Sequence, residues 1–201
     1  MIFRQLTVPP IGTNCYIFGD DAAKMGTIVD PGGDAAGILA AVGDLGLTVS
    51  AIFLTHGHYD HVGALPELRR ALPGVPVYLH PAEASIRDGV LIPDPGPTVD
   101  YGDGSTVAVG GLTVEVIHTP GHTPGGVCLK VGDTLFTGDT LFRGSMGRTD
   151  LPGGSYDQLM DSLRRLAALP GDYKVCPGHD ALSTLETERK SNYYMREALG
   201  Q

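Results

Sequence analysis

Cysteine is scarce in this sequence, and long hydrophobic runs are missing. The three cysteines are an odd number without paired spacing, which fits a reducing compartment better than a disulfide framework. We interpret Cys15, Cys128 and Cys176 as buried structural thiols. No apolar run approaches the ~20 residues that a membrane span needs, and the N-terminal segment lacks the charged and apolar regions of a signal peptide. We therefore expect a cytoplasmic protein that does not associate with membranes.

Basic residues are also in the minority. Lysine and arginine number 14 against 23 acidic residues, which gives a formal net charge of -9. This charge repels nucleic acid phosphates and anionic membranes, and no basic stripe offsets it. The composition therefore disfavours a nucleic acid partner and leaves a small molecule as the expected substrate. The composition does not predict the oligomeric state.

Length and composition are those of one globular domain spanning residues 1–201. A chain of this size buries roughly 70% of the surface that its unfolded form exposes. Glycine (29 residues) and proline (15 residues) are frequent, and they are scattered as turn residues, not gathered into a linker. This pattern is typical of many short strands joined by tight loops.

The order of the predicted elements indicates two packed sheets. Strands in two groups, each followed by helices, favour sheet packed on sheet with helices outside. Ser155 with Gln158 predicts a capping box for one helix, and Ser183 with Glu186 predicts the start of the last helix. The segment from Val90 to Pro97 is expected to be a loop that overhangs a site. Strands are predicted at 2–8, 13–18, 25–30, 50–54, 76–80, 105–109, 112–118, 126–131, 133–137 and 173–176, and earlier helices at 34–45 and from Leu65 to Leu72.

The segment Thr55–His61 is the most informative part of the chain, because it holds three of the seven histidines and one aspartate. Imidazole and carboxylate groups bind Zn²⁺, Mn²⁺ or iron at neutral pH. In an extended loop His56 and His58 project the same way and could reach one ion, which turns Asp60 and His61 toward a second.

Three later segments repeat one arrangement, in which a short strand and a glycine precede a residue that can bind a metal. Glycine lets the backbone turn sharply and approach a site closely. The residues concerned are His122, Asp139 and His179. With the first cluster they make five histidines and two aspartates, enough for two ions if one carboxylate bridges them.

This HxHxDH cluster with its separate His, Asp and His resembles the signature of the metallo-β-lactamase superfamily. The segments 29–33 and 141–154 resemble small glyoxalase II-like hydrolases, the hydroxyacylglutathione hydrolase family, which act on S-acylated glutathione. The resemblance implies an αββα sandwich of two mixed β-sheets with helices on the outer faces. It also implies one metal held by His56, His58 and His122, and another held by Asp60, His61 and His179, with Asp139 bridging.

Such a centre would hydrolyse an activated acyl compound such as S-D-lactoylglutathione. Two ions would lower the pKa of a bridging water from 15.7 toward ~7, so a metal-bridging hydroxide is the expected nucleophile. Asp139 would place the ions, and Asp60 would orient the hydroxide as well as bind metal. Zinc is the favoured metal, with iron and manganese left open.

An anionic substrate needs cationic partners. The candidates for substrate contact are Arg143, Arg148, Arg189, Lys190 and, near the site, Tyr16. The larger glyoxalase II enzymes grip glutathione partly through a C-terminal helical domain. This sequence ends about one helix past His179, so we expect the grip to come from other residues.

Two other functions share part of this pattern. Persulfide dioxygenases resemble the same superfamily but use a single iron held by two histidines and one aspartate. Lactonases share the ligands. The filled set of seven positions and the segment Leu151–Gly154 favour the thioester hydrolase. A β-lactamase is disfavoured by Asp139 and by the missing signal peptide, and an inactive metal protein by the open, cysteine-free ligand set.

Overall fold

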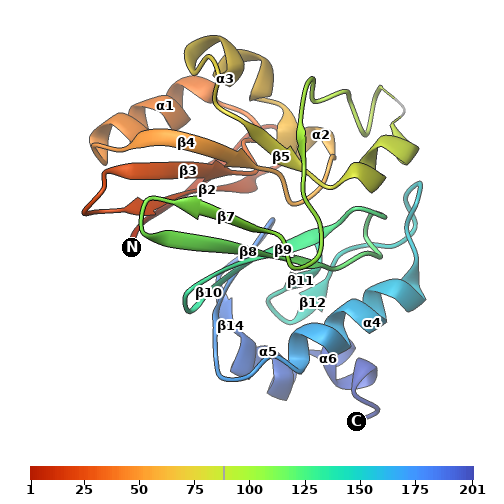
Figure 1. Cartoon of the computed structure of the whole chain (residues 1–201). Coiled ribbons are helices and arrows are strands. Elements are labelled where there is room, and N and C mark those ends of the chain that lie inside the picture. Colours follow the sequence, from red (N-terminus) through yellow and green to blue (C-terminus); the bar gives the residue numbers. More distant parts are fainter. Residues whose placement is uncertain (88) are drawn as a thin grey trace.

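Two six-stranded sheets pack face to face, with helices on both outer sides (Figure 1). The structure is a computed structural model that describes residues 1–87 and 89–201. The first sheet has the order β1 (Ile2–Val8), β2 (Thr13–Asp20), β3 (Met25–Val29), β4 (Thr48–Phe53), β5 (Val77–Leu79) and β6 (Val99–Asp100). The second has the order β14 (Ser183–Thr184), β13 (Lys174–Pro177), β10 (Thr134–Gly138), β9 (Val127–Val131), β8 (Leu112–His118) and β7 (Thr106–Val109).

Both sheets are mixed. In the first, β1, β2 and β3 are antiparallel, and β3 to β6 are parallel. In the second, β10 and β13 are parallel and the remaining pairs are antiparallel. The helices are α1 (Ala35–Asp44), α2 (Tyr59–Val62), α3 (Leu65–Ala71), α4 (Tyr156–Ala167), α5 (Leu185–Ser191) and α6 (Tyr193–Ala198), with a 3-10 turn η1 at Pro81–Ile86 and a small hairpin of β11 (Leu141–Phe142) and β12 (Ser145–Met146). This architecture confirms the predicted αββα sandwich.

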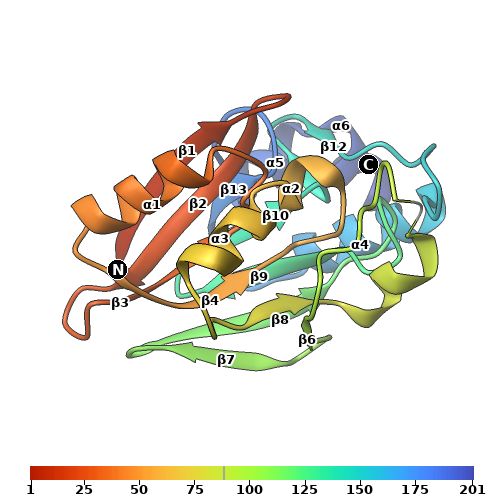
Figure 2. The same cartoon turned by 90° about the horizontal axis from the view of Figure 1, so that it is seen from above.

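Alternation along the first sheet explains how it is covered on both faces. Ile17, Ile28 and Ile52 belong to the core cluster that also contains Ile38 of α1 and Leu68 of α3. Viewed from above, α1 and α3 lie across this sheet (Figure 2). Because successive residues of a strand point to opposite faces, the neighbours of these isoleucines face the second sheet.

The space between the sheets is filled by aromatic side chains. Phe18 and Phe53 of the first sheet belong to the same buried cluster as Phe136 of the second. The Phe18 and Phe136 rings stack with centroids 5.0 Å apart. Burial of such rings dominates the energetics of a core, so these contacts hold the two sheets in a fixed relation.

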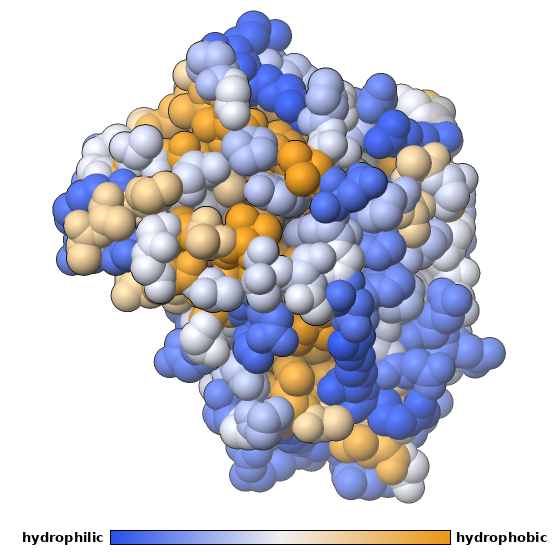
Figure 3. All heavy atoms as spheres, viewed as in Figure 1, coloured by the Kyte–Doolittle hydropathy of each residue, from blue (hydrophilic) through white to orange (hydrophobic). Residues whose placement is uncertain are grey.

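The outer face of the second sheet is covered by α4, α5 and α6. Leu159, Leu163 and Leu166 are buried on one side of α4. Leu163 and Leu166 pack in one cluster with Val175 of β13 and Met195 of α6. The opposite side of α4 is exposed, and the surface over this part of the molecule is mostly hydrophilic (Figure 3). None of the helices in the described ranges is both long enough and apolar enough to span a membrane.

Most predicted elements lie where the sequence places them, with differences at their ends. The side chain of Ser155 accepts a hydrogen bond from the Gln158 amide, which confirms that cap. The cap expected at Ser183 is wrong, because Ser183 ends up in β14 and Thr184 caps α5. The η1 turn and the β11–β12 hairpin were not expected.

Candidate metal centre

The seven histidines and aspartates predicted to bind metal follow four strands that end near one another. The first cluster follows β4, His122 follows β8, Asp139 follows β10 and His179 follows β13. Strands β8, β10 and β13 run in the same direction within the second sheet, as the strand pairings require. Their carboxyl ends therefore meet at one edge of the sheet, where the end of β4 joins them.

One group of potential ligands consists of His56, His58 and His122, whose nitrogen atoms lie within 4.8 Å of one another. His58 Nδ1 and His122 Nε2 are 2.9 Å apart, and all three side chains are buried. His58 has extended backbone angles, as the sequence predicts for this part of the cluster.

A second group consists of Asp60, His61 and His179, also within 4.8 Å. His61 Nε2 lies 3.3 Å, and His179 Nε2 lies 3.2 Å, from Asp60 Oδ2. Asp60 and His61 are part of the single helical turn α2, not of an extended loop. This turn changes the chain direction after His58, and so the next two polar side chains reach the second group.

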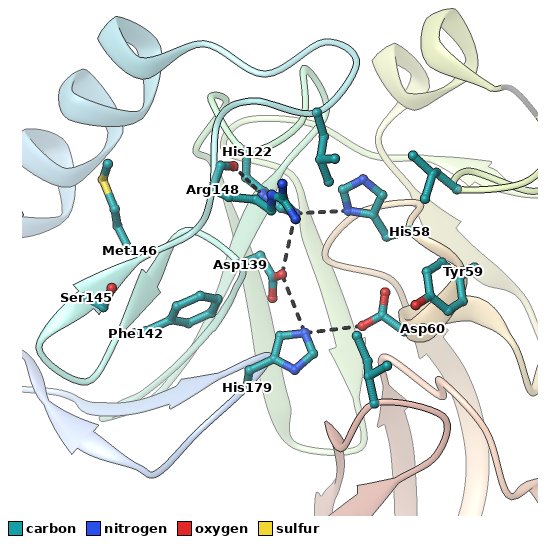
Figure 4. A pocket seen from close by; sticks show the side chains of 13 residues that line it. His58, Tyr59, Asp60, His122, Asp139, Phe142, Ser145, Met146, Arg148 and His179 are labelled. Carbon is teal, nitrogen blue, oxygen red and sulfur yellow. Dashed lines mark hydrogen bonds and ion pairs between the residues drawn. The ribbon is translucent and has the colours of Figure 1, made fainter.

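Asp139 lies between the two groups (Figure 4). Its Oδ2 is 3.4 Å from His122 Nε2 and 3.6 Å from His179 Nε2, while its Oδ1 is 3.4 Å from His61 Nε2. One carboxylate therefore faces histidines of both groups, which is the position that a bridging ligand requires.

Several buried polar atoms at this edge of the described structure have no hydrogen-bond partner, which is what a metal site would leave. Among the described residues, His56 Nε2, His61 Nε2, Asp139 Oδ1 and His58 Nε2 are buried without a hydrogen-bond partner. Buried polar atoms are almost always hydrogen-bonded, so a cluster of unpaired ones points to a missing partner. Nitrogen and oxygen donors at these separations suit divalent ions such as Zn²⁺. The residues fit divalent metal ions.

Burial controls the protonation of the first group. It lowers the pKa of His56, with added repulsion from His61 and His58. Burial, together with His122 and His61, lowers the pKa of His58 to about 4. Both imidazoles are therefore neutral at physiological pH, which is the form that binds metal.

In the second group, neighbouring carboxylates determine the protonation of the histidines. Burial alone would raise the pKa of Asp60, but the neighbouring imidazoles of His179 and His61 and the hydrogen bond from Thr13 hold that pKa below its usual range. Burial alone would lower the pKa of His61, but the charges of Asp139 and Asp30 raise it. Without metal this group is thus an ion-paired cluster, in which a bound cation would take the place of a proton on the histidines.

A cavity of about 490 Å³ opens onto the cluster, and ligand residues form part of its wall (Figure 4). Most of the remaining wall is apolar. The lining residues are Ile11, His58, Tyr59, Asp60, Leu91, His122, Asp139, Phe142, Ser145, Met146, Arg148, Leu151 and His179. Leu91 comes from the loop expected to overhang the site, and Phe142, Ser145 and Met146 come from the β11–β12 hairpin.

Of the cations predicted to contact substrate, the structure brings only Arg148 to this cavity. Its guanidinium is exposed and forms two 2.7 Å hydrogen bonds with Asp150. Its carbonyl oxygen lies 2.7 Å from His122 Nδ1, so the same residue also orients a ligand candidate.

The other three cations lie elsewhere. Arg143 lines a separate groove with Lys174 and Thr187. Arg189 donates hydrogen bonds to the carbonyl oxygens of Ala167, Leu169 and Gly171, at the C-terminal end of α4. Lys190 pairs with Glu186 on an exposed helix face. These positions do not support substrate contact by Arg143, Arg189 or Lys190.

Tyr16 is buried in the core between the sheets and does not line the cavity. Its hydroxyl donates a 2.7 Å hydrogen bond to the carbonyl oxygen of Pro177. Burial raises its pKa, so the phenol stays protonated and keeps donating. Substrate contact by Tyr16 is not supported. Instead it holds the backbone two residues before His179.

Two polar residues at the site were not predicted to act there. Asp30 follows β3 and contacts His61, and Thr13 donates a 2.7 Å hydrogen bond from Oγ1 to Asp60 Oδ2. Asp30 was foreseeable, because it ends a strand next to β4 and is followed by Pro31-Gly32-Gly33. Thr13 begins a strand and has no distinguishing sequence signal. His80 and His118 lie apart from both groups, stacked with centroids 4.3 Å apart.

Comparison with known proteins agrees with this geometry. A family model described as the metallo-beta-lactamase superfamily matches residues 8–179. An uncharacterised protein of Aquifex aeolicus is 39% identical, and the match covers 99% of each chain. The hydroxyacylglutathione hydrolase GloC of Haemophilus influenzae is 34% identical over 97% of this chain and 98% of that protein.

Solved structures are similar over almost the whole chain. BLEG-1, a B3 metallo-beta-lactamase, has a TM-score of 0.87 and 36% identity, covering 96% of this chain and 99% of that one. TTHA1623 in a di-iron-bound form has a TM-score of 0.83 and 37% identity, covering 95% and 99%. ETHE1 from Myxococcus xanthus has a TM-score of 0.83 and 34% identity, covering 96% and 84%.

Proposed function

Because the chain belongs to the metallo-β-lactamase superfamily, we propose that this metal-dependent hydrolase acts on glutathione thioesters such as S-D-lactoylglutathione. The observation that carries the proposal is the position of Asp139, which faces the histidines of both ligand groups from the wall of a cavity. Divalent ions held there would supply the Lewis acidity that activates water and polarises a carbonyl. Zinc is the metal we favour, and a similar protein has been solved with two irons.

The chain offers no thiol nucleophile as an alternative to water. The three cysteines are buried in the core. Burial raises the pKa of Cys176 to about 12 and that of Cys128 to about 11, and it also raises the pKa of Cys15. A thiol is a nucleophile only as the thiolate, so these groups are inert. Water is therefore the nucleophile that we propose.

A thioester suits this cavity for two reasons. A thiolate leaves without needing a proton, so the reaction does not need a general acid. The apolar wall around Phe142, Met146 and Leu151 can pack against an acyl group, and Arg148 can pair with a carboxylate of the thiol. The similar protein named hydroxyacylglutathione hydrolase GloC supports glutathione as that thiol.

A second candidate function is that of a persulfide dioxygenase. It is supported by the similarity to ETHE1, a protein of that class. A mononuclear iron needs two histidines and one carboxylate, and the group of His56, His61 and Asp139 offers such a set. The groups of His56, His58 and His122 and of Asp60, His61 and His179 offer ligands for two ions, which favours the hydrolase. The metal content and the consumption of oxygen separate these two functions.

The proposal is tested by thioester hydrolysis with purified protein. Asp60→Ala and His58→Ala should lower the hydrolysis of S-D-lactoylglutathione by orders of magnitude while circular dichroism stays unchanged. Asp161→Ala serves as the control, because Asp161 lies outside both ligand groups on the exposed side of α4. A lactone and a β-lactam should be hydrolysed poorly beside the thioester. Unchanged thioester turnover in Asp60→Ala would contradict the proposal.

A further inference from the structure

Glu83 is a buried carboxylate whose role neither the sequence nor the proposed reaction explains. It belongs to the η1 turn, its exposed fraction is 0%, and it lines no part of the cavity at the metal cluster. We infer that Glu83 is a positioning residue, which sets the metal affinity of the group formed by His56, His58 and His122.

The inference starts from two hydrogen bonds. Glu83 Oε2 accepts a 2.8 Å hydrogen bond from the amide of Gly57, and Oε1 accepts another of 2.8 Å from the amide of Gly125. Gly57 lies between His56 and His58, and Gly125 lies three residues after His122. A single carboxylate therefore ties together the two loops that carry all three histidines of this group.

The carboxylate of Glu83 packs closely against the backbone of both glycines. A Cβ atom at Gly125 would lie 2.7 Å from Glu83 Oε1, and one at Gly57 would lie 3.0 Å from Oε2. A side chain at either glycine would press on the carboxylate, and more severely at Gly125 than at Gly57. The two loops are thus shaped to receive Glu83.

The three histidines follow two strands that belong to different sheets, so their spacing depends on how the two loops are held. His56 and His58 follow β4 of the first sheet, and His122 follows β8 of the second. Groups that orient ligands without touching the metal commonly change its affinity by 10–100-fold when they are removed. Asp60, His61 and His179 make no contact with Glu83 among the hydrogen bonds and ion pairs of the described residues, so the effect should be confined to the first group.

The test uses metal-free protein titrated with Zn²⁺ by calorimetry in competition with a chelator. Glu83→Gln keeps the size of the side chain but can accept a hydrogen bond at only one atom, so one amide loses its acceptor. His58→Ala identifies which binding step belongs to the first group. Glu83→Gln should weaken that step about 10–100-fold and leave the other step unchanged.

Glu188→Gln is the matched control. Glu188 is equally buried and accepts a 2.7 Å hydrogen bond from the Gly144 amide, in a hairpin that carries none of the three histidines. It should leave the first step unchanged. The absorption spectrum of Co²⁺ bound at the first group should change in Glu83→Gln and not in Glu188→Gln, which a general loss of stability would not produce.

Gly125→Ala provides a second route if Glu83→Gln does not fold, because the added methyl group displaces the same carboxylate. It should weaken the same step. Equal affinities in the wild type, Glu83→Gln and Gly125→Ala would overturn the inference. So would equal weakening of both steps in Glu83→Gln. Since the titration needs only metal, its failure is distinct from a failure to hydrolyse thioesters.

Discussion

Asp30 Oδ2 lies 3.0 Å from His61 Nδ1, and both side chains are buried. The other oxygen of Asp30 accepts a 2.7 Å hydrogen bond from the Thr55 amide, at the start of the histidine cluster. A carboxylate that holds one imidazole nitrogen leaves the other free to face a metal. Asp30 therefore orients His61 and anchors the loop before it.

Asp30→Asn should weaken metal binding at the group of Asp60, His61 and His179 by about 10–100-fold. An amide can accept at only one atom, so either Thr55 or His61 loses its partner. Zinc titration of the metal-free protein measures the change. Asp161→Asn, on the exposed side of α4, should bind metal like the wild type. Equal affinities of Asp30→Asn and Asp161→Asn would contradict the assigned role.

Gly178→Ala should disrupt the centre although it replaces no ligand residue. A Cβ atom at this position would lie 2.2 Å from Asp139 Oδ1 and 2.7 Å from His61 Cε1. Displacement of these side chains by about 1 Å should lower hydrolysis about 100-fold, with a loss of bound metal. Gly43→Ala is the control, because a methyl group there meets nothing within 4 Å and favours helix α1. Full activity of Gly178→Ala would show that the close approach is not needed.

Arg148→Ala should raise the KM for an acyl-glutathione roughly three- to tenfold, which corresponds to about 1 kcal/mol for an exposed ion pair. The kcat should change less, because the guanidinium bonds Asp150 and the contact between the Arg148 carbonyl oxygen and His122 remains. Steady-state kinetics with anionic and neutral thioesters measure the effect. Arg189→Ala should leave KM unchanged and lower the stability instead, since its side chain bonds the end of α4. A raised KM in Arg189→Ala alone would reverse these assignments.

His58 gives the metal-free protein a pH dependence of known sign. Its pKa is lowered from 6.5 to about 4 by burial and by His122 and His61. Between these values the unfolded chain binds a proton that folded His58 does not, so stability falls as the pH is lowered through that window. His58→Gln lacks this term. Relative to it, the wild type should lose up to about 3 kcal/mol between pH 7 and pH 4 in urea unfolding. Parallel curves would contradict the lowered pKa.

The sandwich and the convergence of the metal-binding candidates could be predicted from the sequence, because both follow from the order of the strands. Each candidate follows a short apolar strand, and a glycine directly precedes His122, Asp139 and His179. Strand ends of neighbouring parallel strands meet at one edge, so residues far apart in the chain come together. The turn α2 was missed because four residues are too few to show helical periodicity.

Contacts between distant polar groups could not be predicted in the same way. Arg189 bonds the end of α4, although in the sequence it has the same surroundings as a solvated cation on a helix. Glu83 lies in a 3-10 turn without periodicity, and its partners are backbone amides from two other loops. Such roles depend on the tertiary fold, which places the partners.

The most direct test of the two-metal thioester hydrolase is elemental analysis of the purified protein beside S-D-lactoylglutathione hydrolysis and oxygen uptake. We expect two divalent ions per chain, hydrolysis that a chelator abolishes and added metal restores, and no consumption of oxygen. A single iron per chain with oxygen uptake, or a protein with two bound metals that leaves the thioester intact, would contradict the account.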